Sequence, residues 1–330
     1  MATPIPFVPP LEPVHYGVAE QVSPLIRRIV AENPSKYSYK GTGTYIVGHG
    51  EVAVIDPGPA LDSHRDALAA ALAGERVVAI LVTHCHADHS PLAAWLKETT
   101  GAPTYAFGPH GAIDDPDDPD DPDDPDRAEN ADPSIEPDDE ATTKEAIDIG
   151  FVPDVVTPDG FVIAGPGWTF DAVHTPGHTS NHTCFGMREE RALFTGDHVM
   201  GWSTTVISPP DGDMRAYCHS LRVVMGRDDL TLWPTHGNPV TDPQPFLAAY
   251  LSHRLEREAQ VLACVVGGTG TIAAIVKLLY ADVREELHKA AARSVLSHLR
   301  KLIDDGEVVV DGGGPPSTKA TYGVRSAQVT

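Results

Sequence analysis

The stretch that decides the fold is Thr83-His84-Cys85-His86-Ala87-Asp88-His89. It ends a continuous apolar run that begins at Val77 and is typical of a buried strand. It precedes Ser90-Pro91, which we interpret as the N-cap and first residue of a helix that ends near Thr99. Three imidazoles and a carboxylate therefore crowd a strand-to-helix junction. Polar groups beside an apolar strand are costly unless they are paired or bind a metal, so the segment predicts a metal site.

Three further candidate ligands each follow a short strand-like run later in the chain. They are His178 in Thr175-Pro176-Gly177-His178, Asp197 in Thr195-Gly196-Asp197-His198, and His236 in Pro234-Thr235-His236-Gly237. Glycine or proline beside each one predicts a tight loop at a strand end, where functional groups collect. One zinc ion typically takes four ligands, so seven candidates favour two metal ions that share a carboxylate.

The pattern His-x-His-x-Asp-His, followed by single His, Asp and His motifs, resembles the metallo-β-lactamase superfamily over about Tyr45 to Gly237. The resemblance implies an α/β fold, the αββα metallo-β-lactamase sandwich. It implies that one metal is held by His84, His86 and His178, that the second is held by Asp88, His89 and His236, and that Asp197 bridges the two. Asp56 matches the first motif of the family and is expected to brace the metal loop rather than bind metal.

The implied cofactor is Zn2+, with two ions per chain, although histidine and carboxylate ligands also accept Fe or Mn. Two ions about 3.5–4 Å apart would share a hydroxide that attacks a carbonyl carbon or a phosphorus. Asp88 and Asp197 are the residues predicted to be catalytic, and the resemblance allows Asp88 to accept a proton from the attacking water. Cys85 is not expected to be a nucleophile, because neighbouring histidines committed to metal cannot act as its base.

Other polar residues lie next to the predicted ligands and leave two interpretations open. His174 and His198 either orient ligands or pack within their loops. Asn181 and His182, just after His178, are candidates for contacts with the substrate.

The chain divides into a predicted catalytic domain, residues 1–245, and a helical linker with a winged-helix domain, residues 246–330. Helical patterns at Phe246–Val266, Ile272–Tyr280 and Lys289–Asp304 precede Glu307–Val310, which we interpret as a β wing. This tail resembles the superfamily branch that contains a mitochondrial single-strand endoribonuclease and its bacterial relatives. Hydroxyacylglutathione hydrolases share the metal set but carry a different helical C-terminal domain. The chain departs from the usual pattern at Ser90-Pro91, where glycines often follow the motif.

The net charge of −23 is unevenly distributed. Asp114–Asp148 contains 17 acidic and 2 basic residues, which leaves the rest of the chain mildly acidic. Its Asp-Asp-Pro repeats predict an extended, disordered insert over about residues 113–145, and they lack the glycine and glutamate of an EF-hand calcium loop. A mildly acidic body attracts nucleic acid poorly. DNA is also not an expected partner, because the last predicted helix mixes Lys289, Arg293, Arg300 and Lys301 with the acidic pair Asp304 and Asp305.

The N-terminal Met1–Pro13 is rich in proline and has neither a basic region nor an apolar core, so we expect a cytoplasmic protein. No run approaches the roughly 20 apolar residues of a membrane helix, and a membrane is not an expected partner. The four cysteines form no CxxC pair, which argues against a cysteine zinc knuckle or a disulfide framework.

These observations favour an enzyme, a dinuclear metal-dependent hydrolase acting on a small-molecule ester, thioester or related acyl bond. The first alternative is an endoribonuclease that cleaves single-stranded RNA. The resemblance of the C-terminal tail favours this alternative. Hydrolysis of β-lactams is a further alternative, weakened because such enzymes usually work outside the cytoplasm. A metal-bearing binding module without catalysis is the fourth hypothesis, and the full set of seven ligands argues against it. The sequence does not indicate an oligomeric state.

Overall fold

The computed structural model describes residues 4–110, 146–281 and 288–325. Within these residues, the first sheet has seven strands in chain order: β1 (Glu20–Gln21), β2 (Ile26–Val30), β3 (Gly43–Val47), β4 (Glu51–Ile55), β5 (Arg76–Leu81), β6 (Thr104–Ala106) and β7 (Val155–Val156). Strands β1 to β4 pair antiparallel, whereas β4 to β7 pair parallel. The helices α1 (Asp62–Ala71) and α2 (Leu92–Thr100) make the crossovers that parallel neighbours require.

The second sheet has five strands in the order β12-β11-β10-β9-β8 among the described residues. They are β8 (Val162–Gly165), β9 (Trp168–His174), β10 (Thr183–Met187), β11 (Ala192–Gly196) and β12 (Thr231–Pro234). Because β10 is antiparallel to both β9 and β11, and β12 is parallel to β11, the strands β9, β11 and β12 run in one direction. Their carboxyl ends therefore lie at the same edge of the sheet.

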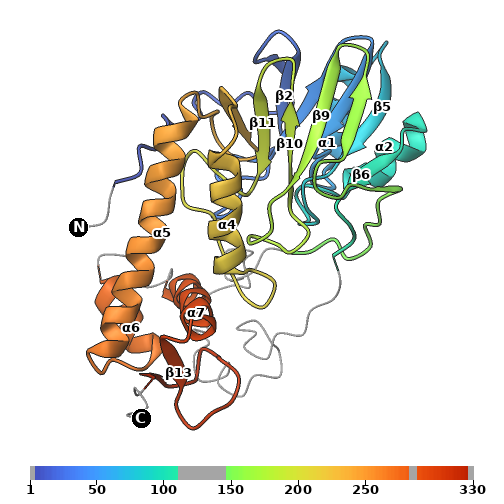
Figure 1. Cartoon of the computed structure of the whole chain (residues 1–330). Coiled ribbons are helices and arrows are strands. Elements are labelled where there is room, and N and C mark those ends of the chain that lie inside the picture. Colours follow the sequence, from blue (N-terminus) through green and yellow to red (C-terminus); the bar gives the residue numbers. More distant parts are fainter. Residues whose placement is uncertain (1–3, 111–145, 282–287, 326–330) are drawn as a thin grey trace, which may run out of the picture.

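The two sheets pack face to face and are covered on the outside by helices (Figure 1). Alternation along β3 shows how the sequence directs this arrangement: Tyr45 packs between the sheets, and Ile46 packs toward α1 and α2. Helices α4 (Met214–Met225) and α5 (Pro243–Val266) cover the second sheet with Tyr217 and Tyr250. The predicted αββα sandwich is confirmed.

The C-terminal module contains α6 (Ile272–Leu279), α7 (His288–Asp304) and an antiparallel wing of β13 (Val308–Val310) and β14 (Tyr322–Val324), at the lower end of α5 in Figure 1. The two helices and the two-stranded wing that the described residues form confirm the predicted winged-helix fold. Helix α5 belongs to both cores. Phe246 near its start packs on the second sheet, whereas Val261 near its end packs on α6 and α7.

Some expectations require correction or stay untested. Ser90 does not cap α2: the helix is preceded by Pro91, and the Ser90 hydroxyl donates to Asp148 instead. The predicted disordered insert over about residues 113–145 lies outside the described residues. No helix in the described part of the chain combines the length and the apolar character needed to cross a membrane.

Candidate metal centre

The predicted ligands stand on four loops, each of which follows a strand. The segment His84–His89 follows β5, His178 follows β9, Asp197 follows β11 and His236 follows β12. Because β9, β11 and β12 share one direction, their loops meet at one edge of the second sheet, where the loop after β5 of the first sheet joins them. The structure therefore brings together all seven residues that the sequence singles out.

The first group consists of His84, His86 and His178, which offer ring nitrogens to a common point. Nδ1 of His86 lies 2.9 Å from Nε2 of His84 and 3.2 Å from Nε2 of His178. Three nitrogens around a tetrahedral zinc ion, at bond lengths of about 2.0–2.1 Å, stand roughly 3.3 Å apart. The spacing of the three rings fits such an ion.

The second group consists of Asp88, His89 and His236. Nε2 of His89 lies 3.5 Å from Oδ1 of Asp88, and Nε2 of His236 lies 3.3 Å from Oδ2 of the same carboxylate. The Asp88 side chain is 24% exposed, whereas the side chains of His89 and His236 are buried. Asp88 is therefore the member of this group that is accessible to solvent.

Asp197 lies between the two groups. Its Oδ1 is 3.6 Å from Nε2 of His89 and 3.4 Å from Nε2 of His236, while its Oδ2 is 3.9 Å from Nε2 of His178. One carboxylate thus directs a different oxygen toward each group. This placement is compatible with a carboxylate that bridges two cations.

Three atoms of this cluster are buried without a hydrogen-bond partner among the described residues: Nε2 of His89, Nε2 of His236 and Oδ1 of Asp197. A buried polar atom with no partner costs about 1–3 kcal/mol, so a cluster of three calls for an explanation. Imidazole nitrogens and a carboxylate oxygen are suitable ligands for zinc and similar divalent metals. The donor set therefore fits metal ions better than any internal pairing.

The electrostatics of the cluster favour deprotonated ligands in the first group. Burial, reinforced by the neighbouring imidazoles, holds the pKa of His84 well below its usual value and lowers the pKa of His86 to about 3. In the second group, burial opposes the charged form of His89, but Asp88, Asp197 and Asp56 outweigh it and raise its pKa to about 9.

Both carboxylates stay ionised. Burial alone would raise the pKa of Asp88 and of Asp197, but the nearby imidazoles of His89 and His236 hold both pKa values well below the usual range. Two ionised carboxylates within a buried cluster supply the negative charge that a pair of divalent cations requires.

A surrounding layer of hydrogen bonds orients the ligands, as is usual around metal sites. Nδ1 of His178 faces the carbonyl oxygen of Val206 at 2.7 Å, and Nδ1 of His236 faces that of Gly41 at 3.2 Å. The Thr42 hydroxyl donates to Oδ2 of Asp88 at 2.7 Å. Sequence reasoning missed Thr42 and Val206, because a lone threonine and a backbone carbonyl leave no motif.

The residues around His178 and Asp197 bond to the backbone of neighbouring loops. Nε2 of His182 accepts a hydrogen bond from the Asp197 backbone amide at 3.2 Å. The Asn181 amide donates to the carbonyl oxygen of Gly108 at 3.1 Å and is buried. The expectation that these two residues contact substrate stays a prediction, and the contacts described for them here are with backbone groups. His174, the last residue of β9, stacks on Phe107, which follows β6, with ring centroids 3.7 Å apart. Its Nε2 faces the carbonyl oxygen of Ser180 at 3.1 Å.

Cys85 packs in the helix-covered core of the first sheet. Burial raises the pKa of its thiol to about 11, so the thiol is protonated at neutral pH. It therefore lacks the thiolate that a nucleophile or a metal ligand requires.

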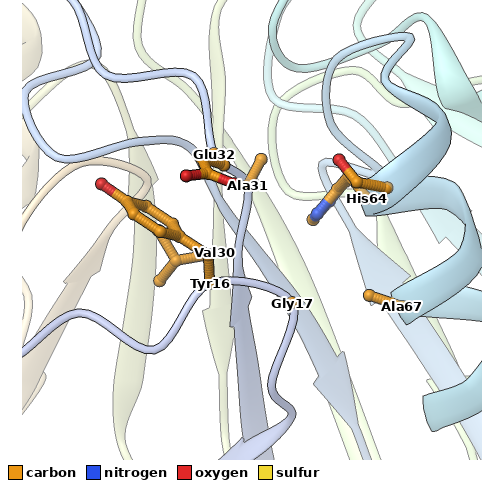
Figure 2. Close-up of a pocket in the computed structure, with 8 residues that line it drawn as sticks. Tyr16, Gly17, Val30, Ala31, Glu32, His64 and Ala67 are labelled. Carbon is orange, nitrogen blue, oxygen red and sulfur yellow. The ribbon is translucent and has the colours of Figure 1, made fainter.

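A separate pocket lies away from this cluster, between α1 and the chain around β2 (Figure 2). Its volume is about 250 Å³, and its lining includes Tyr16, Glu32 and His64. Burial lowers the pKa of His64 to about 4, and its Nε2 contacts the Thr44 hydroxyl at 2.8 Å. None of the seven clustered residues lines this pocket.

Comparison with family models gives two matches. The model described as "Metallo-beta-lactamase superfamily" matches residues 40–236, and the model described as "Beta-lactamase associated winged helix domain" matches residues 271–315. The chain is 31% identical over 316 residues to the atrochrysone carboxyl ACP thioesterase of Aspergillus chevalieri, covering 92% of this chain and 87% of that protein. It is 29% identical over 315 residues to the lactamase-like protein ptaB of Pestalotiopsis fici, covering 91% and 85% of the two chains.

Solved structures give the same fold along nearly the whole chain. A beta-lactamase domain protein from Burkholderia ambifaria superposes with a TM-score of 0.70 at 19% identity, covering 94% of this chain and 95% of that chain. A metallo-beta-lactamase family protein from Thermus thermophilus superposes with a TM-score of 0.66 at 23% identity, covering 92% and 100%.

Proposed function

The chain belongs to the metallo-β-lactamase superfamily of hydrolases, and from that premise we propose that it hydrolyses acyl thioesters with two divalent metal ions, zinc in the first instance, held by the seven clustered residues. The substrate partner in this proposal is a small-molecule thioester. Relatives along most of the chain carry the name atrochrysone carboxyl ACP thioesterase, which supports a thioester over the other acyl bonds.

The observation that carries the proposal is the position of Asp197. Its two oxygens face two separate groups of ligands, and Oδ1 is buried without a hydrogen-bond partner among the described residues. A single-metal or purely structural site has no need for a carboxylate in this place. We therefore assign His84, His86 and His178 to one ion, Asp88, His89 and His236 to the other, and Asp197 to both.

Bound at these positions, two metal ions would act as Lewis acids and lower the pKa of a coordinated water toward about 7. The protein contributes the rest. Asp88 is ionised and partly exposed, so it is placed to accept a proton from a water that enters on that side. The burial of the other six ligands keeps the remaining sides of the centre dry. Dry surroundings strengthen the electrostatic stabilisation of an oxyanion.

The test combines elemental analysis of the purified protein with a hydrolysis panel of thioesters, oxygen esters, single-stranded RNA and a β-lactam, each with and without chelator. We expect about two zinc ions per chain and chelator-sensitive thioester hydrolysis. Asp197→Ala should abolish turnover while the circular dichroism spectrum stays native, and Asp171→Ala, in an exposed ion pair with Arg188, should change neither.

The outcomes separate the alternatives. Metal-dependent RNA cleavage without thioester hydrolysis would make the chain a nuclease, and its binding should then weaken steeply with salt. Full turnover by a folded Asp197→Ala variant that has both metals bound would refute the bridging assignment. The absence of bound metal would refute the dinuclear centre.

A further inference from the structure

The backbone of the metal loop is paired with a segment that lies far from it in sequence. The Ala87 amide donates to the carbonyl oxygen of Ala146 at 2.8 Å, and the Asp148 amide donates to the carbonyl oxygen of Cys85 at 2.7 Å. These two bonds form an isolated antiparallel bridge between His86 and Ile147. The bridge is centred on His86, the residue whose Nδ1 faces both of the other histidines in the first group.

The same segment holds the far end of the loop through a side chain. The Ser90 hydroxyl donates to Oδ2 of Asp148 at 2.7 Å. Ser90 is 1% exposed, so this hydroxyl has little access to water as an alternative partner. Asp148 therefore makes two hydrogen bonds to the loop: its amide donates to Cys85, and its carboxylate accepts from Ser90. His86 and Asp88 lie between these two points along the chain.

Neither contact belongs to the sheet that supports the loop. The ladder of β5 ends at Leu81, and the last bond to the β6 side joins the Val82 amide to Tyr105. Beyond that point Thr83 is held from the other side, by Asp56 and by the Thr183 amide. Within the stretch from Cys85 to Ser90, Thr42 and Asp56 hold the side chains of Asp88 and His89, and the Gly58 amide donates to the His89 carbonyl oxygen. Residues 146–148 hold the backbone on either side of His86.

We propose that Asp148, through Ser90 and the bridge at His86, is a positioning residue that sets the affinity of the three-histidine group for its metal ion. This inference rests on the proposed metal centre. Glycine at position 90 would have no hydroxyl to donate. The hydrogen bond to Asp148 therefore depends on the serine that this chain carries. Loss of the side-chain contact frees the end of the loop and lets His86 depart from the common point of the three nitrogens. Outer partners of this kind typically change metal affinity by about 10–100-fold.

The experiment measures stepwise zinc affinity by competition with a chromophoric chelator, on the full chain, for Ser90→Ala and Asp148→Ala. Each should lower the affinity for one zinc ion about 10-fold or more and leave the other within about threefold. Asp148→Asn keeps the volume and an acceptor oxygen for Ser90, so it should bind zinc as the unchanged protein does. Thermal unfolding of the metal-free variants reports any general loss of structure.

The matched control is Asp154→Ala, which removes a carboxylate that accepts from the Thr104 amide and hydroxyl at 3.0 Å each, outside the metal loop. It should leave both zinc affinities intact. Unchanged affinities in Ser90→Ala and Asp148→Ala would overturn the inference, as would an equal loss in Asp154→Ala. If the unchanged protein bound no zinc, the proposed metal centre itself would fail, and the inference would fall with it.

Discussion

Oδ2 of Asp56 lies 2.9 Å from Nδ1 of His89, at the end of a buried strand 33 residues earlier in the chain. The same oxygen accepts from the hydroxyls of Thr83 at 2.8 Å and Thr235 at 3.1 Å, and Oδ1 accepts from the Thr83 amide at 2.8 Å. One buried carboxylate thus fixes the ring of a predicted ligand, the start of the metal loop and the loop before His236. Asp56 hydrogen-bonds to all three groups but is not itself one of the seven clustered residues.

Replacement of this carboxylate by Asp56→Ala should therefore weaken metal binding. Zinc affinity is expected to fall about 10–100-fold, because His89 loses the partner that orients its ring. The Thr83 and Thr235 donors would be left buried and unpaired, at a cost of about 1–3 kcal/mol each in the free energy of unfolding. Zinc content after dialysis and a urea titration measure the two effects. Asp66→Ala, in an exposed ion pair with Arg65 on α1, is the control and should change neither.

The loop that presents Val206 to His178 is held by Tyr250 of α5. Its hydroxyl donates to the carbonyl oxygen of Ser203 at 2.8 Å and accepts from the Thr205 amide at 2.7 Å. Tyr250→Phe removes one hydroxyl and leaves two buried backbone groups short of a partner. We expect the free energy of unfolding to fall by about 1–3 kcal/mol, as measured by urea denaturation.

Tyr105→Phe is a suitable comparison, since the Tyr105 side chain is only partly buried at the edge of the core between the sheets. The expected change in the free energy of unfolding is within about 0.5 kcal/mol. Equal stability of the Tyr250 and Tyr105 variants would contradict the support that we assign to α5.

Gly177, just before His178, has no room for a side chain. Its φ is +137°, and a Cβ there would lie 2.4 Å from Cα of Tyr217 in α4. Gly177→Ala should therefore destabilise the fold by about 2–4 kcal/mol, through backbone strain and a clash that only a shift of α4 relieves. Thermal unfolding measures the loss.

Gly160→Ala separates the two causes. Gly160 has a φ of +76° but nothing within 4 Å of an added Cβ, so it carries only the strain. A Gly177→Ala variant as stable as Gly160→Ala would show that α4 does not restrict this position.

Cys85 should be chemically inert in the native protein. Its thiol is buried and its pKa is raised to about 11, so at pH 8 the reactive thiolate is scarce. Iodoacetamide should label the half-buried Cys264 first, as peptide mass spectrometry would reveal. Cys85→Ala should keep turnover within about threefold. Lost turnover in a folded, metal-loaded Cys85→Ala protein would revive the nucleophile hypothesis.

The sequence singled out the seven residues that the structure brings together, because their chemistry is concentrated in short motifs beside apolar runs. It also predicted β5, whose continuous apolar residues are a strong signal. It missed β10, in which Gly186 is a poor strand former and pairing with two buried neighbours supplies the stability instead. Helix α4 was missed although Asp213 caps it and its buried residues Met214, Tyr217, Cys218 and Leu221 follow helical spacing.

The supporting contacts were beyond sequence reasoning for another reason. Ser90 carries the expected signal of an N-cap, but its hydroxyl is taken by Asp148, 58 residues away. His182 and Asn181 stand beside a ligand and invite a substrate role, yet both are buried against the backbone of other loops. Such pairings are decided by tertiary structure, and local pattern carries no information about them.

Helix α5 has a consequence for how this chain can be divided or recombined. Its first turns belong to the hydrolase layer through Phe246 and Tyr250, and its last turns belong to the winged helix through Val261 and Val265. A cut at residue 245 would remove one of the two helices that cover the second sheet, and with it the anchor of the Val206 loop. In an exchange of C-terminal modules between relatives, the two chains would have to be joined inside the helix, beyond Arg254. Only then would α5 remain one unbroken helix.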